Sequence, residues 1–354
     1  MRKGVPDMIW AWLLGALAVM AILLTAIAFA CLHMVFGTRC DGDPSLRYFT
    51  HEDFDGMRAQ PVSFPSDRGQ LLRGAVYTCG RDETPVGLVV FAHGMGGGHL
   101  SYMTEIHTFA AAGFAVLAYD NTGTCASDGK KLVGFYQAVR DLRYALAFVR
   151  GRQDLSRLPV VLAGHSWGGY AVCQSLAYAG EAVSGVVALS APESVSRTIC
   201  DMMSGALGVK MGWMRPFFSA VLLLSDGLGA VRRTSAVLKK STVPVLLLHG
   251  DADKSVLYAN SPLAQKAVRG KENITGIVCE GRGHNVYQTA ESERYLNERF
   301  AEISAAKKKY RGKIPGQEKK RLYDIDYALI TEEDSDIMKT VVDFMKACVG
   351  RGSV

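Results

Sequence analysis

One serine of this chain has the surroundings of an activated nucleophile. Ser166 lies in a G-x-S-x-G pattern at 164–168, directly after the apolar run 160–163. A strand that turns sharply into a helix at such a pattern raises the serine hydroxyl at the end of a sheet, and side chains at the glycine positions would clash there. The backbone N–H groups that open the helix would face a developing oxyanion. The segment therefore predicts a nucleophilic serine.

Candidate partners for this serine follow later in the chain. Asp251 and Asp253 come after the apolar run 243–250, and His284 comes after the run 274–279. A serine hydroxyl is a poor nucleophile at neutral pH, so it needs a base within hydrogen-bond reach and a carboxylate that orients that base. The order serine, aspartate, histidine, with each residue just past a strand, is typical of a Ser-His-Asp hydrolase triad.

Four segments carry a family resemblance: 93–97, 164–169, 249–253 and 283–284. The chain resembles the α/β-hydrolase superfamily, in the branch of monoacylglycerol lipases, lysophospholipases and serine aminopeptidase-like hydrolases, over roughly residues 60–300 and again near 335–348. The resemblance implies a mostly parallel, doubly wound sheet with a helical cap insertion. Its H-G-x-x-D pattern selects Asp253 over Asp251 as the acid. It also implies an oxyanion hole built from the backbone N–H groups of Met95 and Trp167.

One loop departs from the family pattern. The family often has D-x-x-G-x-G-x-S after the next strand, and the segment 120–127 has Cys125 in place of the second glycine. This loop shapes the entrance of the site, so the departure bears on fine specificity rather than on the reaction type. Cys125 itself is a poor candidate nucleophile because the pattern pairs no base with it.

The other histidines favour structural roles. His93 and His249 end strands before a glycine, where hydrogen bonding to the backbone is the simpler interpretation. His165 is adjacent to the serine, and neighbouring side chains on a turn point in different directions. His99 and His107 are too isolated to suggest a metal pair. Metal-ligand spacing is missing from the sequence, so we expect neither a metal nor a cofactor.

The N-terminal segment predicts a membrane anchor. Residues 8–36 carry no Asp, Glu, Lys or Arg, and this length exceeds the ~20 residues that cross a bilayer. Arg2 and Lys3 precede the segment, which favours a cytoplasmic N-terminus and an extracytoplasmic catalytic domain. A cleaved signal peptide, with small residues at 28–30, and a buried core helix are the alternatives.

The rest of the chain divides into a linker and one hydrolase domain. We expect an anchor at 1–37, a linker and lead-in at 38–60, and the α/β-hydrolase domain at 61–350, opening with an antiparallel pair at 62–64 and 71–77. Apolar strands then alternate with helical stretches such as 136–150, as in a mostly parallel sheet.

Two insertions interrupt this alternation. The interval of about 193–240 is rich in methionine and aromatic residues, and it either caps the site with an apolar acyl pocket or packs on its own core. The interval of about 305–325 is strongly basic, and it either faces water or touches anionic lipid headgroups. The net charge of +6 comes largely from this basic cluster, so nucleic acid is not an expected partner. The eight cysteines are scattered and predict no disulfide pairing.

Together these patterns predict a membrane-anchored serine hydrolase that cleaves carboxylic esters through an acyl-enzyme intermediate. Ser166 is the expected nucleophile, His284 the base and Asp253 the acid. The resemblance implies small-molecule or lipid esters, such as monoglycerides or lysolipids, as substrates. An aminopeptidase or amidase would use the same machinery, and a silent membrane-tethered binding protein on this fold is the alternative outside the enzymes.

Overall fold

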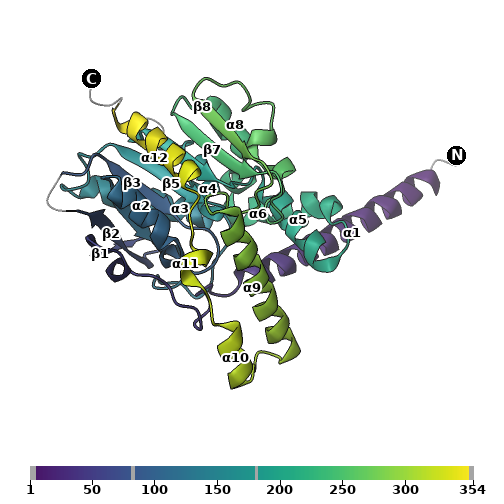
Figure 1. Cartoon of the computed structure of the whole chain (residues 1–354). Helices are drawn as coiled ribbons and strands as arrows, with labels where there is room; N and C mark the ends of the chain where they lie inside the picture. The colour runs from purple at the N-terminus through teal and green to yellow at the C-terminus, as the bar shows by residue number, and fades with distance from the viewer. Residues whose placement is uncertain (1–4, 81–83, 180–181, 351–354) are drawn as a thin grey trace.

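A computed structural model describes residues 5–80, 84–179 and 182–350, and in these ranges the strands form one eight-stranded sheet (Figure 1). The order across the sheet is β1-β2-β4-β3-β5-β6-β7-β8. The strands are β1 Met57–Pro65, β2 Leu71–Cys79, β3 Leu88–Ala92, β4 Ala115–Tyr119, β5 Val160–His165, β6 Gly185–Leu189, β7 Val245–Gly250 and β8 Ile274–Cys279.

The pairing of the strands follows the sequence pattern. β1 and β2 form the predicted antiparallel pair, in which Phe64 faces Leu72, and β2 is also antiparallel to β4. From β4 to β8 all neighbours are parallel. The central strands β3, β4, β6 and β7 are buried along their whole length, as expected for parallel strands covered on both faces. The expected α/β-hydrolase-type sheet is confirmed.

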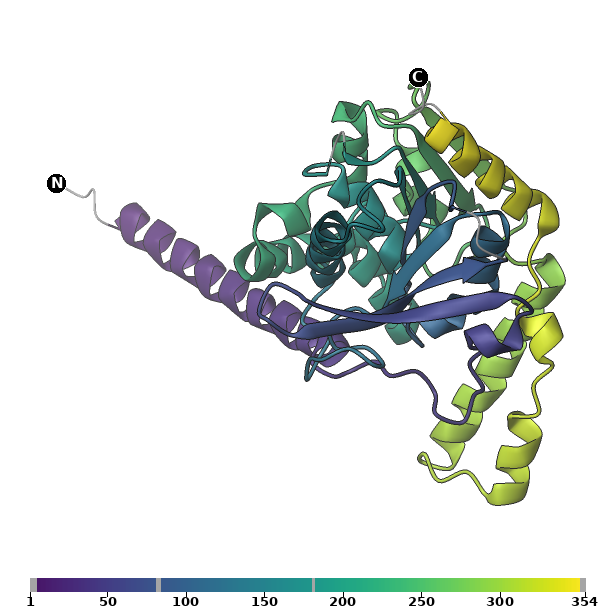
Figure 2. The same cartoon turned by 90° about the vertical axis from the view of Figure 1, so that its left-hand side faces the viewer.

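Helices cover both faces of this sheet (Figures 1 and 2). α3 and α4 pack on one face and α2 and α12 on the other. In α12 the buried residues include Met338, Val341 and Met345, a helical spacing that puts one apolar stripe against the sheet. The helices are α1 Val5–Phe36, α2 Met103–Ala111, α3 Gln137–Gly151, α4 Trp167–Ser175, α5 Val195–Leu207, α6 Arg215–Asp226, α7 Leu228–Val231, α8 Thr234–Lys240, α9 Ala290–Lys309, α10 Gly316–Leu322, α11 Tyr327–Ile330 and α12 Ser335–Gly350.

Helix α1 projects from the domain and also enters its core (Figure 2). Residues Met8–Phe36 are long and apolar enough to span a membrane, and most of the segment is exposed. Ala28, Leu32 and Phe36 near its C-terminal end are buried within the hydrolase core. Arg2 and Lys3, which carry the expected orientation, lie outside the described residues.

The two intervals outside the βα alternation form helical layers. Residues 195–240 form α5 to α8, and this group packs against α1 and α4. Residues 290–330 form α9 to α11 around a small apolar cluster that includes Ile303, Leu322 and Ile325. The first strand begins at Met57, inside the segment 38–60 that the sequence assigned to a linker.

Candidate active site

Ser166 sits at a sharp turn between β5 and α4. Its backbone angles, φ 55° and ψ −112°, fall in a region that non-glycine residues rarely adopt. The turn also needs close backbone approach, because a Cβ on Gly168 would lie 1.8 Å from the carbonyl oxygen of Ala92. Strain of this kind is found where a fold holds one side chain in a fixed position. The predicted strand-to-helix turn is therefore present, with the serine at its tip.

Asp253 and His284 are brought together from the ends of β7 and β8. The Nδ1 atom of His284 lies 2.8 Å from Oδ2 of Asp253. The other carboxylate oxygen of Asp253 accepts backbone N–H groups from Ser255 at 2.8 Å and Val256 at 2.9 Å. The side chain of Asp253 is 0 % exposed, so the carboxylate is fixed in direction as well as in place. This arrangement leaves Nε2 of His284 free to face the cavity that Ser166 also lines.

The surroundings of Asp253 keep its carboxylate ionised. Burial alone would raise its pKa, but contacts from His249 and His284 and the N–H group of Val256 outweigh burial and hold the pKa below its usual range. His249 lies 3.4 Å from Oδ2 of Asp253 and donates to the carbonyl of Val256 at 2.8 Å. His249 therefore supports the acid loop through the backbone, which fits its expected structural role.

The loop that carries His284 is held by three side chains, two of which, Glu293 and Ser190, have no motif in the sequence. The carboxylate of Glu293, in the first turns of α9, accepts the N–H of Gly283 at 2.8 Å and the N–H of Asn285 at 3.0 Å. The carbonyl of His284 accepts from Ser190 Oγ at 2.6 Å and from His165 Nε2 at 3.0 Å. Both backbone neighbours of His284, and its own carbonyl, are thus fixed.

His165 also links this loop to the loop after β3. Its Nδ1 atom lies 2.9 Å from the hydroxyl of Tyr102, which accepts the N–H of Gly94 at 3.1 Å. Burial and the neighbouring His284 lower the pKa of His165 to about 3, so this imidazole is neutral at physiological pH. A neutral ring that donates through Nε2 and accepts through Nδ1 satisfies all of these contacts. His165 thus bonds the carbonyl of His284 and the hydroxyl of Tyr102, a role in line with the expectation that it is not the base of Ser166.

The two residues predicted to supply oxyanion donors are placed by α4 and by the cavity wall. Trp167 is the first residue of α4, and its buried indole donates to the carbonyl of Phe135 at 2.6 Å, which fixes the start of the helix. Met95 lines the same cavity as Ser166 and His284. The loop that carries Met95 is packed closely, since a Cβ on Gly97 would lie 2.5 Å from the ring of Tyr48.

A cavity of about 330 Å³ opens at these residues. Part of its wall comes from two segments that are far apart in the sequence, the lead-in to β1 and the helical interval that follows the histidine loop. None of the described residues of 193–240 lines it, since that interval packs against α1 and α4 instead. The apolar and aromatic side chains of the wall include Leu46, Tyr48, Phe49, Leu100, Leu296, Phe300, Ile325, Tyr327 and Ile330.

The two wall segments are joined by polar contacts around Asp43. Its carboxylate accepts from Lys307 Nζ at 2.8 Å and from the hydroxyl of Tyr323 at 2.7 Å. The backbone N–H of Asp43 donates to the hydroxyl of Tyr48 at 3.0 Å. Burial alone would raise the pKa of Asp43, but the bond from Lys307 and its other donors hold the pKa below its usual range. One residue of the basic interval, Lys307, therefore joins the two segments that form the cavity wall.

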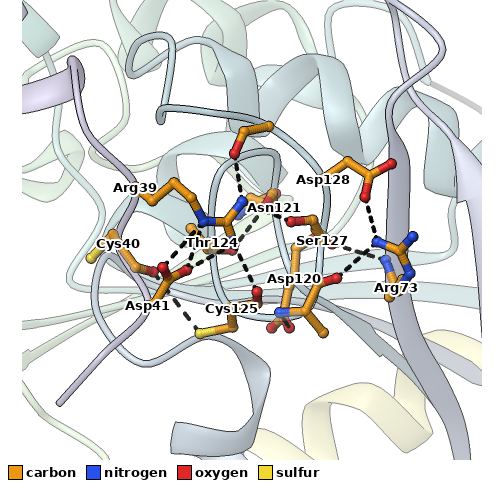
Figure 3. A network of polar contacts seen from close by, with 12 residues as sticks. Arg39, Cys40, Asp41, Arg73, Asp120, Asn121, Thr124, Cys125, Ser127 and Asp128 are labelled. Carbon is orange, nitrogen blue, oxygen red and sulfur yellow. Dashed lines mark hydrogen bonds and ion pairs between the residues drawn. The ribbon is translucent and has the colours of Figure 1, made fainter. Parts of the chain in front are cut away.

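The loop after β4, which carries Cys125, is fastened to the N-terminal segment (Figure 3). The guanidinium of Arg39 donates to the carbonyls of Cys125 at 2.8 Å and Ser127 at 3.1 Å and pairs with Asp41 at 2.8 Å. Cys125 has φ 40°, a conformation in which the family's usual glycine is unstrained. Burial raises the pKa of Cys125 to about 12, so its thiol stays protonated.

The remaining histidines make local contacts. His93 is fully buried and bonds the carbonyl of Gly94 through Nδ1 at 2.6 Å, as expected for a structural residue. His99 lies 2.7 Å from Asp120 and 2.9 Å from the hydroxyl of Tyr77. His107 stacks on Phe54 at 4.7 Å between ring centroids.

Comparison with known proteins agrees with this fold. Residues 83–223 match the family model described as serine aminopeptidase, S33. The chain is 27 % identical to the human monoglyceride lipase over 254 residues, which cover 62 % of this chain and 82 % of that protein. It is 26 % identical to the monoacylglycerol lipase of Mycolicibacterium smegmatis, covering 61 % of this chain and 88 % of that protein.

A solved structure has the same architecture. An esterase of Pyrococcus furiosus aligns with 77 % of this chain and 98 % of its own, at 18 % identity and a TM-score of 0.55. The chain is thus an esterase- or lipase-like α/β-hydrolase of the serine hydrolase type, similar to the monoacylglycerol lipase branch.

Proposed function

We propose that the chain is a membrane-anchored carboxylic ester hydrolase whose triad is Ser166, His284 and Asp253. The observation that carries this proposal is the 2.8 Å bond between His284 and Asp253, at the wall of the cavity that holds the strained Ser166. Acyl transfer needs a base that is oriented by a buried carboxylate and a nucleophile that is held in a fixed position.

The chemistry follows from the positions of these groups. The hydroxyl of Ser166 attacks the ester carbonyl carbon while Nε2 of His284 takes its proton. The imidazolium then gives the proton to the leaving alcohol, and a water repeats the sequence to release the acid. Asp253 fixes the tautomer of His284 and stabilises its charged form. The N–H groups of Met95 and Trp167 hold the oxyanion, and such a donor typically contributes ~2.7–4 kcal/mol to the transition state.

The cavity favours a substrate with an apolar chain. Phe49, Leu296, Phe300 and Ile330 supply apolar surface beside Ser166, and burying apolar area is the main source of affinity for an acyl or alkyl group. We expect esters of medium or long acyl chains, such as monoglycerides or lysolipids, to be better substrates than acetyl esters.

The charges of the cavity weigh against the aminopeptidase alternative. An aminopeptidase must bind the ammonium group of a free N-terminus, which calls for a carboxylate near the nucleophile. The described residues that line this cavity include Arg47 and no aspartate or glutamate. A panel of p-nitrophenyl esters and aminoacyl anilides tests this preference, and cleavage of the anilides alone would refute the ester assignment.

The proposed membrane anchor is supported by the division of α1 into an exposed N-terminal part and a C-terminal part that packs in the core. Its exposed, uncharged part runs over 8–27, which at 1.5 Å per residue gives roughly 30 Å, the thickness of a bilayer core. Cleavage after Ala30 would cut between the buried Ala28 and Leu32, within a helix that packs in the core. This packing favours an anchor that is retained. With the N-terminus cytoplasmic, protease added to intact cells would digest the catalytic domain, and full protection would reverse the proposed orientation.

Labelling with a fluorophosphonate probe tests the nucleophile. We expect the wild-type protein to be labelled and Ser166→Ala to be unlabelled, with the exposed Ser156→Ala as a matched control that keeps full labelling. Labelling of Ser166→Ala at the wild-type rate would refute the assignment. Folded wild-type protein that is never labelled would instead support the silent binding protein.

A further inference from the structure

The surface of the interval 202–228 is unusually apolar for a part of the domain that faces outward. Leu224 is 81 % exposed, Leu228 75 % and Trp213 59 %. Leu207, Val209 and Leu223 are also exposed in the same interval. Large exposed apolar patches mark sites that contact a partner or a membrane. We call this set of six side chains the α5–α7 face.

The structure describes every residue of this interval, and few of its charged side chains are exposed. Asp226 is turned inward, since its side chain is 6 % exposed and pairs with Arg140 at 2.8 Å. Arg215 is partly buried, which leaves Lys210 as the one fully exposed ionisable residue of 202–228. Helix α9, by contrast, carries exposed acidic and basic side chains along its length. The α5–α7 face therefore lacks the charges that this chain places on another of its exposed helices.

The α5–α7 face is continuous with α1. Helix α6 packs directly on α1, and Figures 1 and 2 both draw α5 and α6 alongside the C-terminal half of α1. Val221 and Leu222 of α6 share a groove with Phe29 and Leu32 of α1. The exposed apolar surface thus continues from the candidate membrane span onto the domain.

Cationic side chains lie where α1 enters the domain. Arg68, Lys131 and Arg140 line the groove beside His33 and Phe36 at the end of α1. Arg68 and Arg140 pair there with Asp67 at 3.5 Å and with Asp226 at 2.8 Å, and Lys131 is exposed. Both leaflets carry phosphates in their headgroups, so basic side chains at either end of a membrane-spanning helix pair with them. Aromatic rings such as Trp213 favour the interfacial layer. A lipid leaflet has apolar acyl chains inside and charged headgroups at its surface. An apolar protein surface bordered by basic side chains matches this sequence of layers.

We propose that the α5–α7 face is immersed in the leaflet from which α1 emerges, so that the domain contacts the bilayer through a surface as well as through its anchor. This proposal rests on the proposed membrane anchoring of α1. The contact fixes the orientation of the domain, because a second attachment beside the helix prevents rotation about the helix axis. The partner is the lipid itself, with its acyl chains against Leu224 and Leu228 and its phosphates near the basic border.

Tryptophan quenching tests the contact in the full-length chain. The protein has four tryptophans, of which Trp10 and Trp12 are in α1 and Trp167 is fully buried. In W10F/W12F protein reconstituted into phosphatidylcholine vesicles, lipids brominated on the acyl chain should quench the emission of Trp213. The quenching should disappear in W10F/W12F/W213F, where only the shielded Trp167 remains.

A second variant separates this contact from the anchor. In W213F protein, Trp10 and Trp12 report the insertion of α1 alone. Quenching of Trp10 and Trp12 without quenching of Trp213 would overturn the proposed contact and leave the anchor standing, whereas quenching of neither would refute the anchor as well. Shielding of Trp213 by a second copy, seen as a cross-linked dimer without lipid quenching, would also overturn the proposal.

Charge placed on the α5–α7 face provides a matched comparison. Leu224→Glu should reduce the quenching of Trp213 because a carboxylate resists transfer out of water. Leu257→Glu changes another exposed leucine, 40 % exposed and outside the interval, and should leave the quenching unchanged. Ester hydrolysis by both variants confirms that they are folded. Equal quenching in Leu224→Glu and Leu257→Glu would count against the proposed surface.

Discussion

Glu293 is the side chain whose removal best tests how the base is held in place. Its carboxylate accepts the N–H groups on both sides of His284, at 2.8 and 3.0 Å, and it is 8 % exposed. Glu293→Gln keeps the size of the side chain but replaces one acceptor oxygen by an NH2 group. One of the two backbone N–H groups then faces a donor instead of an acceptor.

The expected loss follows from the number of bonds. A hydrogen bond to a charged group contributes ~1.5–3 kcal/mol, and the substitution removes one such bond and the charge behind the other. We expect the oriented conformation of His284 to be disfavoured by about 2 kcal/mol, which lowers kcat/KM about 30-fold. The effect should fall on kcat more than on KM, because Glu293 positions the base and is not among the residues that line the cavity.

The assay is steady-state hydrolysis of a p-nitrophenyl ester together with the rate of fluorophosphonate labelling. Labelling reports the activation of Ser166 without a bound acyl chain, so both rates should fall together. Glu298→Gln, an exposed position on the same helix, is the matched control. If Glu293→Gln were folded and hydrolysed esters within about twofold of Glu298→Gln, well short of the factor expected for one charged bond, the positioning role would be refuted.

Three further outcomes are expected. Asp253→Asn should lower kcat by ~10³–10⁴-fold, because its amide cannot fix the tautomer of His284. Asp251→Asn should keep a kcat near that of the wild type, because Asp251 is exposed and bonds the N–H of Gly281. The reverse result would exchange the two assignments. Burial raises the pKa of Glu333, which interacts with the buried Glu105, so the folded state binds an extra proton above the usual carboxyl pKa and stability should fall as pH rises through the range between the usual and the raised pKa. Glu333→Gln should therefore raise the Tm relative to wild type more at pH 8 than at pH 5, and a pH-independent difference would contradict the linkage. Phe300→Ala should lower kcat/KM for long-chain esters more than for acetyl esters, and an equal loss for both would remove this ring from the acyl site.

The sequence indicated the parts of the site that follow from local pattern. Ser166, Asp253 and His284 each come just past an apolar strand, and the carboxyl ends of parallel strands meet at one edge of a sheet. The glycines of the G-x-S-x-G pattern were also recognisable from the sequence. The structure gives the reason for Gly168, because its backbone passes against Ala92. The strand pattern was equally direct, because β3 to β7 are short apolar runs bounded by turns.

The cavity wall and the supports of His284 have no such signature. Tyr48 accepts the backbone N–H of Asp43 and Tyr323 donates to its carboxylate. The two tyrosines are separated by most of the chain, so only the folded structure places them together. Glu293 resembles any acidic residue near the start of a helix, and its bonds to the histidine loop depend on how α9 is set against β8. The methionine-rich interval gave a composition that fits either a cap or a packed layer, and its position beside α1 was not encoded in a local pattern.

The entry of α1 into the hydrophobic core makes the proposed anchor a rigid extension of the domain rather than a flexible linker. Ala28, Leu32 and Phe36 are part of the folded interior, and Phe36 meets Phe135 edge to face at 6.3 Å. Because α1 is one continuous helix from the proposed anchor into the core, the proposed anchoring would hold the mouth of the cavity at a constant height and tilt relative to the bilayer. An enzyme held in this way would sample its surroundings by lateral diffusion in the membrane, and it would meet molecules that reach one fixed level above the bilayer.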